Sequence, residues 1–176
     1  KSNTRPGTVY EEPPNVIIAH LSGLDSVGHR YAVKNSDEYE EKLRWLDEQF
    51  AIIFPKVPES WTVVVTADHG LTDSGQHGSP DLEIREVGAW MWGPKVKENY
   101  YYPEQIDQRD LATLPSLLFS LPLPHAVHGK FPLDAFDLTE FGDDKYEELD
   151  QWNWNATISR NEWMQENGHP YFEDLS

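Results

Sequence analysis

The stretch Thr62-Val-Val-Val-Thr-Ala-Asp-His-Gly70 joins an apolar, β-branched run directly to two polar side chains and a glycine. Such a run predicts a buried strand over residues 62–67. In open α/β sheets, ligands bind beyond the carboxyl ends of the strands. Asp68 and His69 therefore stand at a position where chemistry is expected.

The flanking sequence predicts further strands and helices. Residues 15–21 form another apolar, β-branched run, and residues 87–92 read as a third strand. Apolar residues recur at steps of three and four between Tyr39 and Phe54, which predicts a helix that begins after an N-cap at Ser36. A second helix is expected over 110–121, with Pro115 near its first turn. This order predicts an α/β fold with a mostly parallel sheet flanked by helices.

Two other segments carry no regular pattern. Residues 22–35 contain glycines and follow the first expected strand, so they read as a loop. From residue 137 the chain becomes rich in acids, Asn and Trp without a clear period. We therefore expect a main domain over 1–136 and an acidic, aromatic-rich extension over 137–176 that packs through its aromatic side chains.

Composition excludes several classes of protein. The 14 basic residues face 31 acidic ones, which gives a formal net charge of −17. This balance argues against binding to nucleic acid, which needs clustered Lys and Arg. There is no cysteine, so thiolate metal sites are excluded, and no apolar run approaches the roughly 20 residues that span a bilayer. A phosphate-binding site in this chain would need a local positive charge, and bound metal ions are its obvious source.

Three clusters of Asp, His and Gly follow the predicted strands. They are Asp25-Ser-Val-Gly-His29, Asp68-His69-Gly70 and Gly75-Gln-His77-Gly78. Imidazole nitrogen and carboxylate oxygen together suit zinc or a similar divalent ion. The five ligands predict one three-ligand site and one incomplete site, and two metals about 4 Å apart can clamp a phosphoryl group. Each cluster by itself could simply be a capped or solvated loop, and the prediction rests on all three occurring in order.

These motifs resemble the alkaline phosphatase superfamily, in particular its phosphodiesterase-like branch. Within that branch the chain is most similar to the GPI ethanolamine phosphate transferases. The resemblance covers roughly residues 15–136 and is most specific in residues 20–31 and 67–78. It implies part of an alkaline-phosphatase-like sheet, with Asp25, His29 and His77 on one zinc and Asp68 and His69 on the other.

The resemblance also implies what lies outside these residues. In the family a Thr nucleophile and a further Asp come from the N-terminal half of the domain, and only fourteen residues precede Asn15. We therefore expect no catalytic nucleophile in this chain, no activity from it alone, and a missing N-terminal half as its partner in cis or in trans. The family's donor is phosphatidylethanolamine and its acceptor is a mannose of the GPI glycan. A phosphate-ester or phospholipid substrate and the endoplasmic reticulum lumen or secretory pathway are the corresponding expectations, and the sequon Asn155-Ala-Thr also favours that pathway.

Two alternatives stay open at this point. One is another phosphodiesterase or a metal-dependent mutase of the same superfamily, although the short spacing between His69 and His77 favours the phosphodiesterase-like branch. A helical His-Asp phosphohydrolase is disfavoured because its ligands sit on helices, whereas these are expected to follow strands. The other alternative is a non-catalytic metal-binding or interaction module, which would bind metal or a partner without turnover.

Overall fold

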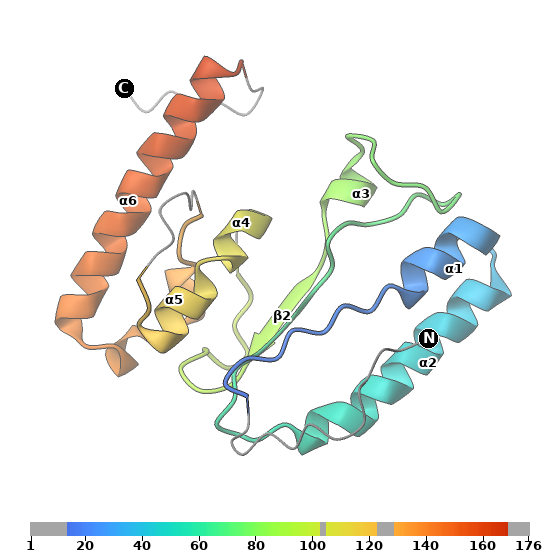
Figure 1. Ribbon diagram of the computed structural model, residues 1–176, viewed down its shortest axis with the longest axis horizontal. Helices are drawn as coiled ribbons and strands as arrows, with labels where there is room; N and C mark the ends of the chain where they lie inside the picture. The colour runs from blue at the N-terminus through green and yellow to red at the C-terminus, as the bar shows by residue number, and fades with distance from the viewer. Residues whose placement is uncertain (1–13, 103–104, 123–128, 169–176) are drawn as a thin grey trace. The chain divides into compact units, whose positions relative to one another are not determined.

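The computed structural model describes residues 14–102, 105–122 and 129–168 (Figure 1). Its described residues divide into two compact units. The first unit comprises residues 14–53 and 70–85, and the second comprises residues 54–69, 86–102, 105–122 and 129–168. We describe each unit by itself. Among the described residues, no helix combines the length and the apolar character that crossing a membrane requires.

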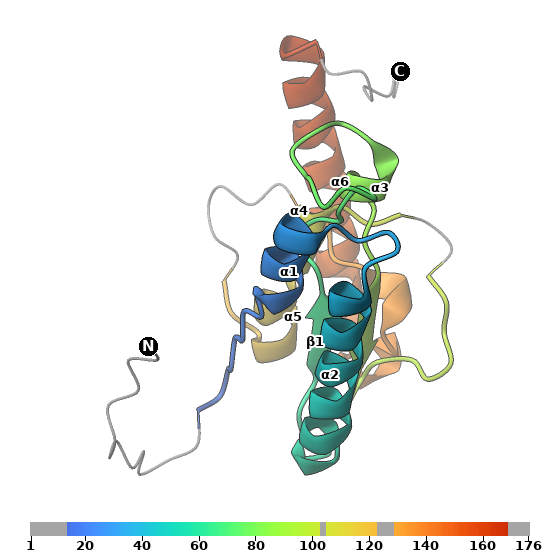
Figure 2. The same cartoon turned by 90° about the vertical axis from the view of Figure 1, so that its right-hand side faces the viewer.

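The first unit is built on two helices that lie side by side (Figures 1 and 2). They are α1 (Gly23–Tyr31) and α2 (Asp37–Ile53), and a single turn of helix, α3 (Leu82–Arg85), lies in the segment 70–85. The structure confirms the predicted helix after Ser36, whose hydroxyl accepts a hydrogen bond from the Tyr39 amide at 3.1 Å.

Two predictions for the first unit are wrong. The segment 22–35 was expected as a loop, but most of it forms α1, with Gly28 buried against the side chain of Leu71. The expected strand over residues 15–21 lies outside any strand and is exposed, with Ile18 91% accessible. A β-branched run favours the extended conformation, but a strand also needs a partner for its backbone groups. None of the described residues pairs with this segment as a strand.

The second unit contains the sheet, and both of its strands were predicted. β1 (Val63–Thr66) pairs with β2 (Ala89–Trp92), so that Val63 stands opposite Trp92. The pairing is antiparallel, and the mostly parallel sheet expected from the apolar runs is not seen among the described residues. Val64 and Trp90 are exposed, which an antiparallel sheet with one open face allows and a doubly covered parallel sheet does not. The mixture of helices and strands remains as predicted.

The core of the second unit lies around short helices. The helix expected over 110–121 is broken into α4 (Gln108–Leu111) and α5 (Leu114–Phe119), with Pro115 in the first turn of α5 as predicted. The described part of this unit also contains the 3-10 turns η1 (Phe54–Lys56), η2 (Leu133–Ala135) and η3 (Leu138–Glu140). The buried apolar cluster consists of Leu114, Leu117, Phe131, Leu133, Phe136 and Leu149.

The C-terminal segment forms one long helix. α6 (Asp143–Glu166) lies in the part of the chain that showed no clear period. Leu149 packs into the core, Ala156 is buried, and Trp152 donates a hydrogen bond to the Gly129 carbonyl at 3.4 Å. Trp152 packs against the core, whereas Trp154 and Trp163 are exposed. The domain boundary at residue 136 and the extension after it stay predictions.

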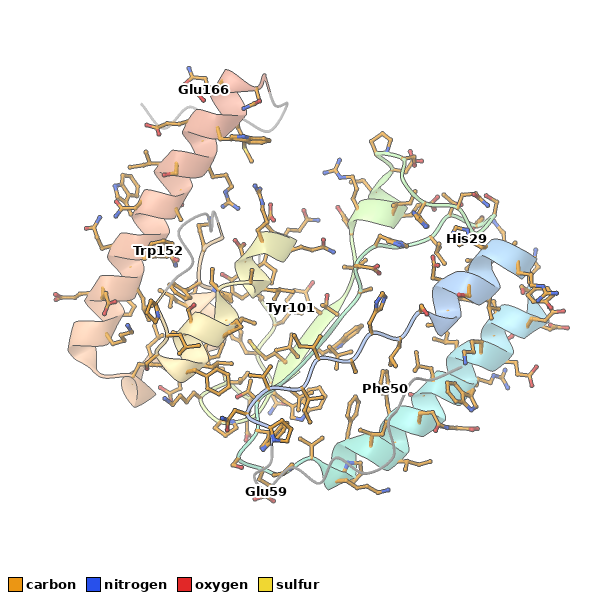
Figure 3. All side chains as sticks on the ribbon, viewed as in Figure 1. His29, Phe50, Glu59, Tyr101, Trp152 and Glu166 are labelled. Carbon is orange, nitrogen blue, oxygen red and sulfur yellow. The ribbon has the colours of Figure 1, made fainter. Side chains whose placement is uncertain are left out.

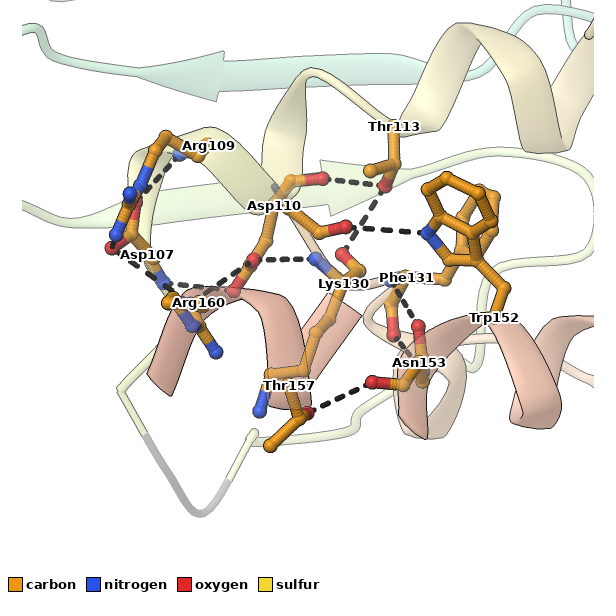
Figure 4. Close-up of polar contacts among 11 residues, drawn as sticks. Asp107, Arg109, Asp110, Thr113, Lys130, Phe131, Trp152, Asn153, Thr157 and Arg160 are labelled. Atoms are coloured by element: carbon orange, nitrogen blue, oxygen red, sulfur yellow. Dashed lines mark hydrogen bonds and ion pairs between the residues drawn. The ribbon is translucent and has the colours of Figure 1, made fainter. Parts of the chain in front are cut away.

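Polar contacts fasten α6 to the rest of the second unit (Figure 4). The Asn153 side chain accepts from the Phe131 amide at 2.7 Å and donates to the Phe131 carbonyl at 2.9 Å. The buried Asp110 carboxylate accepts from the backbone amides of Asp107 and Lys130, and the Arg160 guanidinium lies 3.7 Å from it. These bonds satisfy polar groups that would otherwise be buried without partners.

Candidate metal centre

α1 presents two of the predicted ligands on one face. Asp25 and His29 are four residues apart in this helix, and residues at that spacing are neighbours on a helix surface. Nε2 of His29 lies 3.3 Å from Oδ1 of Asp25. His29 stands in the last turn of α1 (Figure 3). The ligands were expected in a loop after a strand, and the helix aligns the pair more rigidly than a loop would.

A folded loop brings the third ligand to this helix. The segment 70–85, here called the His77 loop, is closed at its base by a hydrogen bond from the Gly70 amide to the Ile84 carbonyl at 2.7 Å. The Asp73 carbonyl accepts from the amides of Val33 and Lys34, each at 3.0 Å, just after α1. As a result, Nε2 of His77 lies 3.7 Å from Oδ1 of Asp25. The rings of His77 and His29 have centroids 4.9 Å apart.

The arrangement fits a divalent metal. Oδ1 of Asp25 is buried and makes no hydrogen bond with any of the described residues. Two imidazole nitrogens converge on this oxygen at 3.3 and 3.7 Å. Ligand atoms that bind zinc tetrahedrally at about 2.0–2.1 Å lie about 3.3–3.4 Å from one another, so the separation of each imidazole nitrogen from Oδ1 of Asp25 is close to that of a zinc site. The orphaned oxygen and the N/N/O donor set are therefore what a zinc or similar ion would satisfy.

Tyr39 of α2 adds to the electrostatics of the centre. Burial, and to a lesser extent the negative charge of Asp25, raise the pKa of the Tyr39 hydroxyl. Its ring also lies beside Gly28 of α1, where a Cβ atom added to the glycine would stand 3.4 Å from Cε2 of Tyr39. Tyr39 therefore lies close enough to feel the charge of Asp25, and the sequence carried no signal that would have singled it out.

The other two predicted ligands lie in the second unit, directly after β1. The Asp68 carboxylate accepts from the His69 amide at 3.1 Å, and its other oxygen lies 3.7 Å from Nε2 of His69. Gln108 donates from its side-chain amide to the carbonyls of Ala67 at 3.1 Å and Asp68 at 2.6 Å. Gln108 therefore fixes the backbone that carries this pair, a role that sequence reasoning missed.

The structure thus brings Asp25, His29 and His77 together in the first unit and keeps Asp68 beside His69 in the second. Asp68 and His69 follow a strand, as expected. Asp25 and His29 do not, because they lie on a helix. The argument that set a helical phosphohydrolase aside because its ligands sit on helices is wrong for this pair.

Comparison with protein families identifies the family to which the chain belongs. A model of the type I phosphodiesterase / nucleotide pyrophosphatase family matches residues 2–111. The chain therefore belongs to this family, whose members are generally metal-dependent. The match contains all five predicted ligands and confirms the resemblance to the phosphodiesterase-like branch.

Curated relatives narrow the similarity further. The chain is 31% identical over 148 residues to GPI ethanolamine phosphate transferase 1 of Schizosaccharomyces pombe, a match that covers 69% of this chain and 16% of that protein. It is 30% identical over 154 residues to GPI ethanolamine phosphate transferase 1 of Yarrowia lipolytica, and that match covers 70% of this chain and 16% of the relative. It is 29% identical over 126 residues to the catalytic subunit of GPI ethanolamine phosphate transferase 3 of Homo sapiens, and that match covers 69% of this chain and 11% of the relative. The chain thus spans a sixth or less of the length of these relatives. No solved structure matches it.

Proposed function

We propose that this chain is part of a two-zinc enzyme that transfers phosphoethanolamine during GPI-anchor synthesis. The observation that carries the proposal is the orphaned, buried Oδ1 of Asp25 between the imidazoles of His29 and His77. Its support from relatives is that the curated proteins matched over about 70% of the chain bear the name GPI ethanolamine phosphate transferase.

The five ligands divide into two sets in this proposal. Asp25, His29 and His77 hold one ion, and Asp68 and His69 contribute to the other. When bound, two such ions supply Lewis acidity to the phosphoryl oxygens and positive charge where charge develops during transfer. This chain's own contribution is to orient the ligands, through the helical register of α1, the closed His77 loop and the Gln108 contacts behind Asp68.

The proposal places the nucleophile outside these 176 residues. A Thr side chain and a further carboxylate would come from another part of the enzyme, in cis or in trans, and the chain alone would bind metal without turnover. The substrate is then a phosphate ester or a phospholipid, and the site of action is the endoplasmic reticulum lumen or the secretory pathway. Since the chain carries a formal charge of −17, the negatively charged phosphate of such a substrate would be repelled without the bound ions.

Hydrolysis is the second candidate, because the family model that matches the chain is described as phosphodiesterase and pyrophosphatase. In both reactions the Thr nucleophile would first take up the phosphoryl group covalently, and they differ in whether an acceptor hydroxyl or water then removes that group. The same metal ligands serve both reactions. The acceptor therefore distinguishes these functions, and the metal site does not.

Metal content is the first test. The purified chain, loaded with zinc and freed of excess ion, is analysed by elemental mass spectrometry beside His77→Ala. We expect bound zinc in the wild type and its loss in the variant. A wild-type chain that retains no zinc would contradict a self-sufficient site on Asp25, His29 and His77.

A chimera tests the reaction. The matched segment of the Schizosaccharomyces pombe transferase 1 is replaced by the corresponding residues of this chain, and phosphoethanolamine transfer is measured in membranes. We expect transfer in the chimera and none when it carries His29→Ala. A chimera that binds zinc and hydrolyses the donor without transferring it would favour the phosphodiesterase function instead.

A further inference from the structure

The His77 loop touches α1 at a point where two backbones meet. Gly75 is buried in this contact and has a φ of +76°. A Cβ atom at Gly75 would lie 1.9 Å from the carbonyl oxygen of Gly28 and 2.5 Å from its carbonyl carbon. Since Cβ atoms essentially never approach other heavy atoms within 3.0 Å, no residue with a side chain fits here unless the backbones separate.

This contact stands between two of the metal ligands. Gly28 directly precedes His29, and Gly75 is two residues before His77. The loop around Gly75 is internally tight, because its amide donates to the Thr72 carbonyl at 2.8 Å and the Thr72 amide donates to the Gln76 carbonyl at 2.9 Å. A shift forced at Gly75 would therefore move His77 with it rather than be absorbed within the turn.

We propose that Gly75 is a positioning residue of the metal centre, because the absence of a side chain there sets the distance between His77 and the Asp25–His29 face of α1. The effect of Gly75 on zinc binding rests on the proposed function, whereas its effect on the position of His77 does not. To reach ordinary contact with the Gly28 carbonyl, an added Cβ must push the loop away by more than 1 Å. Metal sites tolerate deviations of about 0.2 Å in ligand distance, so His77 would leave the donor set.

Two other glycines provide matched controls. A Cβ at Gly28, on the opposite side of the same contact, would meet Cδ1 of Leu71 at 2.7 Å, and that atom is the end of a side chain that can rotate away. Gly78 also has a positive φ, +93°, but a Cβ there would have nothing within 4 Å. Gly78→Ala therefore imposes backbone strain beside His77 without a clash, whereas Gly75→Ala imposes both.

The first experiment needs no metal. Nuclear Overhauser effects between the ring protons of His29 and His77 are measured in the full chain in the presence of a chelator. We expect a contact in the wild type, in Gly28→Ala and in Gly78→Ala, and its loss in Gly75→Ala. Gly75→Asn is included because Asn tolerates positive φ better than Ala does, so its loss of the contact reports the clash and not the strain.

Retention of the ring contact in Gly75→Asn would overturn the proposal, and so would its loss in Gly78→Ala to the same extent as in Gly75→Ala. The amide signals of α2 show in each variant whether the first unit is folded. If Gly75→Ala unfolds this unit, the ring contact in Gly75→Asn tests the proposal instead, because Asn introduces the same Cβ atom with less backbone strain at positive φ.

Zinc binding supplies the second readout. We expect Gly75→Ala and Gly75→Asn to bind zinc at least tenfold more weakly than Gly28→Ala and Gly78→Ala. In the two Gly75 variants we also expect zinc to shift the Nε2 resonance of His29 but not that of His77, whereas in the wild type it should shift both. A wild-type chain that binds no zinc would contradict a self-sufficient metal site in this chain, while the ring contacts would still decide the role of Gly75. Unchanged zinc affinity in both Gly75 variants would overturn that role.

Discussion

Oδ1 of Asp25 lies 3.3 Å from Nε2 of His29, one helical turn away, yet no hydrogen bond from the described residues satisfies this buried oxygen. A buried acceptor without a partner lowers stability, and more so when it carries charge. A metal ion bound between these atoms would remove that cost in the folded state only. Metal binding and the stability of the first unit should therefore be linked.

Asp25→Asn tests this linkage. An ion that binds only the folded state at 100 times its Kd raises the free energy of unfolding by about 2.7 kcal/mol. We expect zinc to produce a gain of this order in the wild type and little gain in Asp25→Asn, because the amide is a weaker ligand. Without metal, the variant should be at least as stable as the wild type, because it carries no charge at the orphaned position.

Urea unfolding, followed by the amide NMR signals of α2, measures both quantities with and without zinc. Asp47→Asn is the control, because Asp47 lies on the exposed surface of α2. A zinc-dependent gain in Asp25→Asn as large as that of the wild type would contradict the linkage.

The histidines allow a second comparison. His29→Ala removes a predicted ligand from α1 and should weaken zinc binding at least tenfold. His20→Ala removes an imidazole that is exposed and lies outside the centre, so zinc affinity should not change. Competition with a chromophoric chelator measures both constants, and equal losses in the two variants would mean that zinc binds the chain non-specifically.

Much of the local structure followed from the sequence where a pattern and its cap agreed. The three- and four-residue steps between Tyr39 and Phe54, with Ser36 before them, predicted α2, and the β-branched run predicted β1. α6 was missed although Leu149, Trp152 and Ala156 follow helical spacing. The polar Asn153 lies among them, and its hydrogen bonds to Phe131 cannot be seen in a pattern of apolar residues.

The candidate site shows the same limit. Residue types and their order identified the five ligands, but the glycines of residues 22–35 concealed α1. The four-residue spacing of Asp25 and His29 was a signal for a helix, because such a pair meets only in that register. The closeness of His77 to this pair depends on the backbone contact between Gly75 and Gly28, which joins residues far apart in sequence.

Asn153 should be the more important of two neighbouring asparagines in α6. Its side chain makes two hydrogen bonds to the backbone of Phe131, so Asn153→Ala removes both and takes from the Phe131 amide the acceptor it has here, while the Phe131 carbonyl keeps its bond from the Leu133 amide at 2.9 Å. We expect a loss of about 2–3 kcal/mol in the free energy of unfolding. Asn155→Ala is the matched control on the exposed side, with an expected change within about 0.5 kcal/mol. Urea unfolding of the metal-free chain checks both values, and similar losses would contradict the anchoring role of Asn153.

Asp107 should make the second unit sensitive to acid. The side-chain hydrogen bond from Arg109 lowers the pKa of Asp107 from 3.8 to about 2. Because the pKa is lower in the folded state than in the unfolded state, this carboxylate stabilises the fold fully above about pH 4. The contribution is lost as the pH falls from about 4 towards 2. Its side chain is about one third exposed, so screening reduces the contribution to about 1 kcal/mol.

Asp107→Asn isolates this contribution, because the amide does not titrate. The variant should be less stable than the wild type above pH 4, and the two should converge as the pH is lowered to about 2. Urea midpoints measured across this range in the presence of a chelator give the difference, and Asp134→Asn, at an exposed position of the same unit, should follow the wild type throughout. A difference between Asp107→Asn and the wild type that stays constant with pH would show that Asp107 stabilises the fold through hydrogen bonding alone and not through its charge.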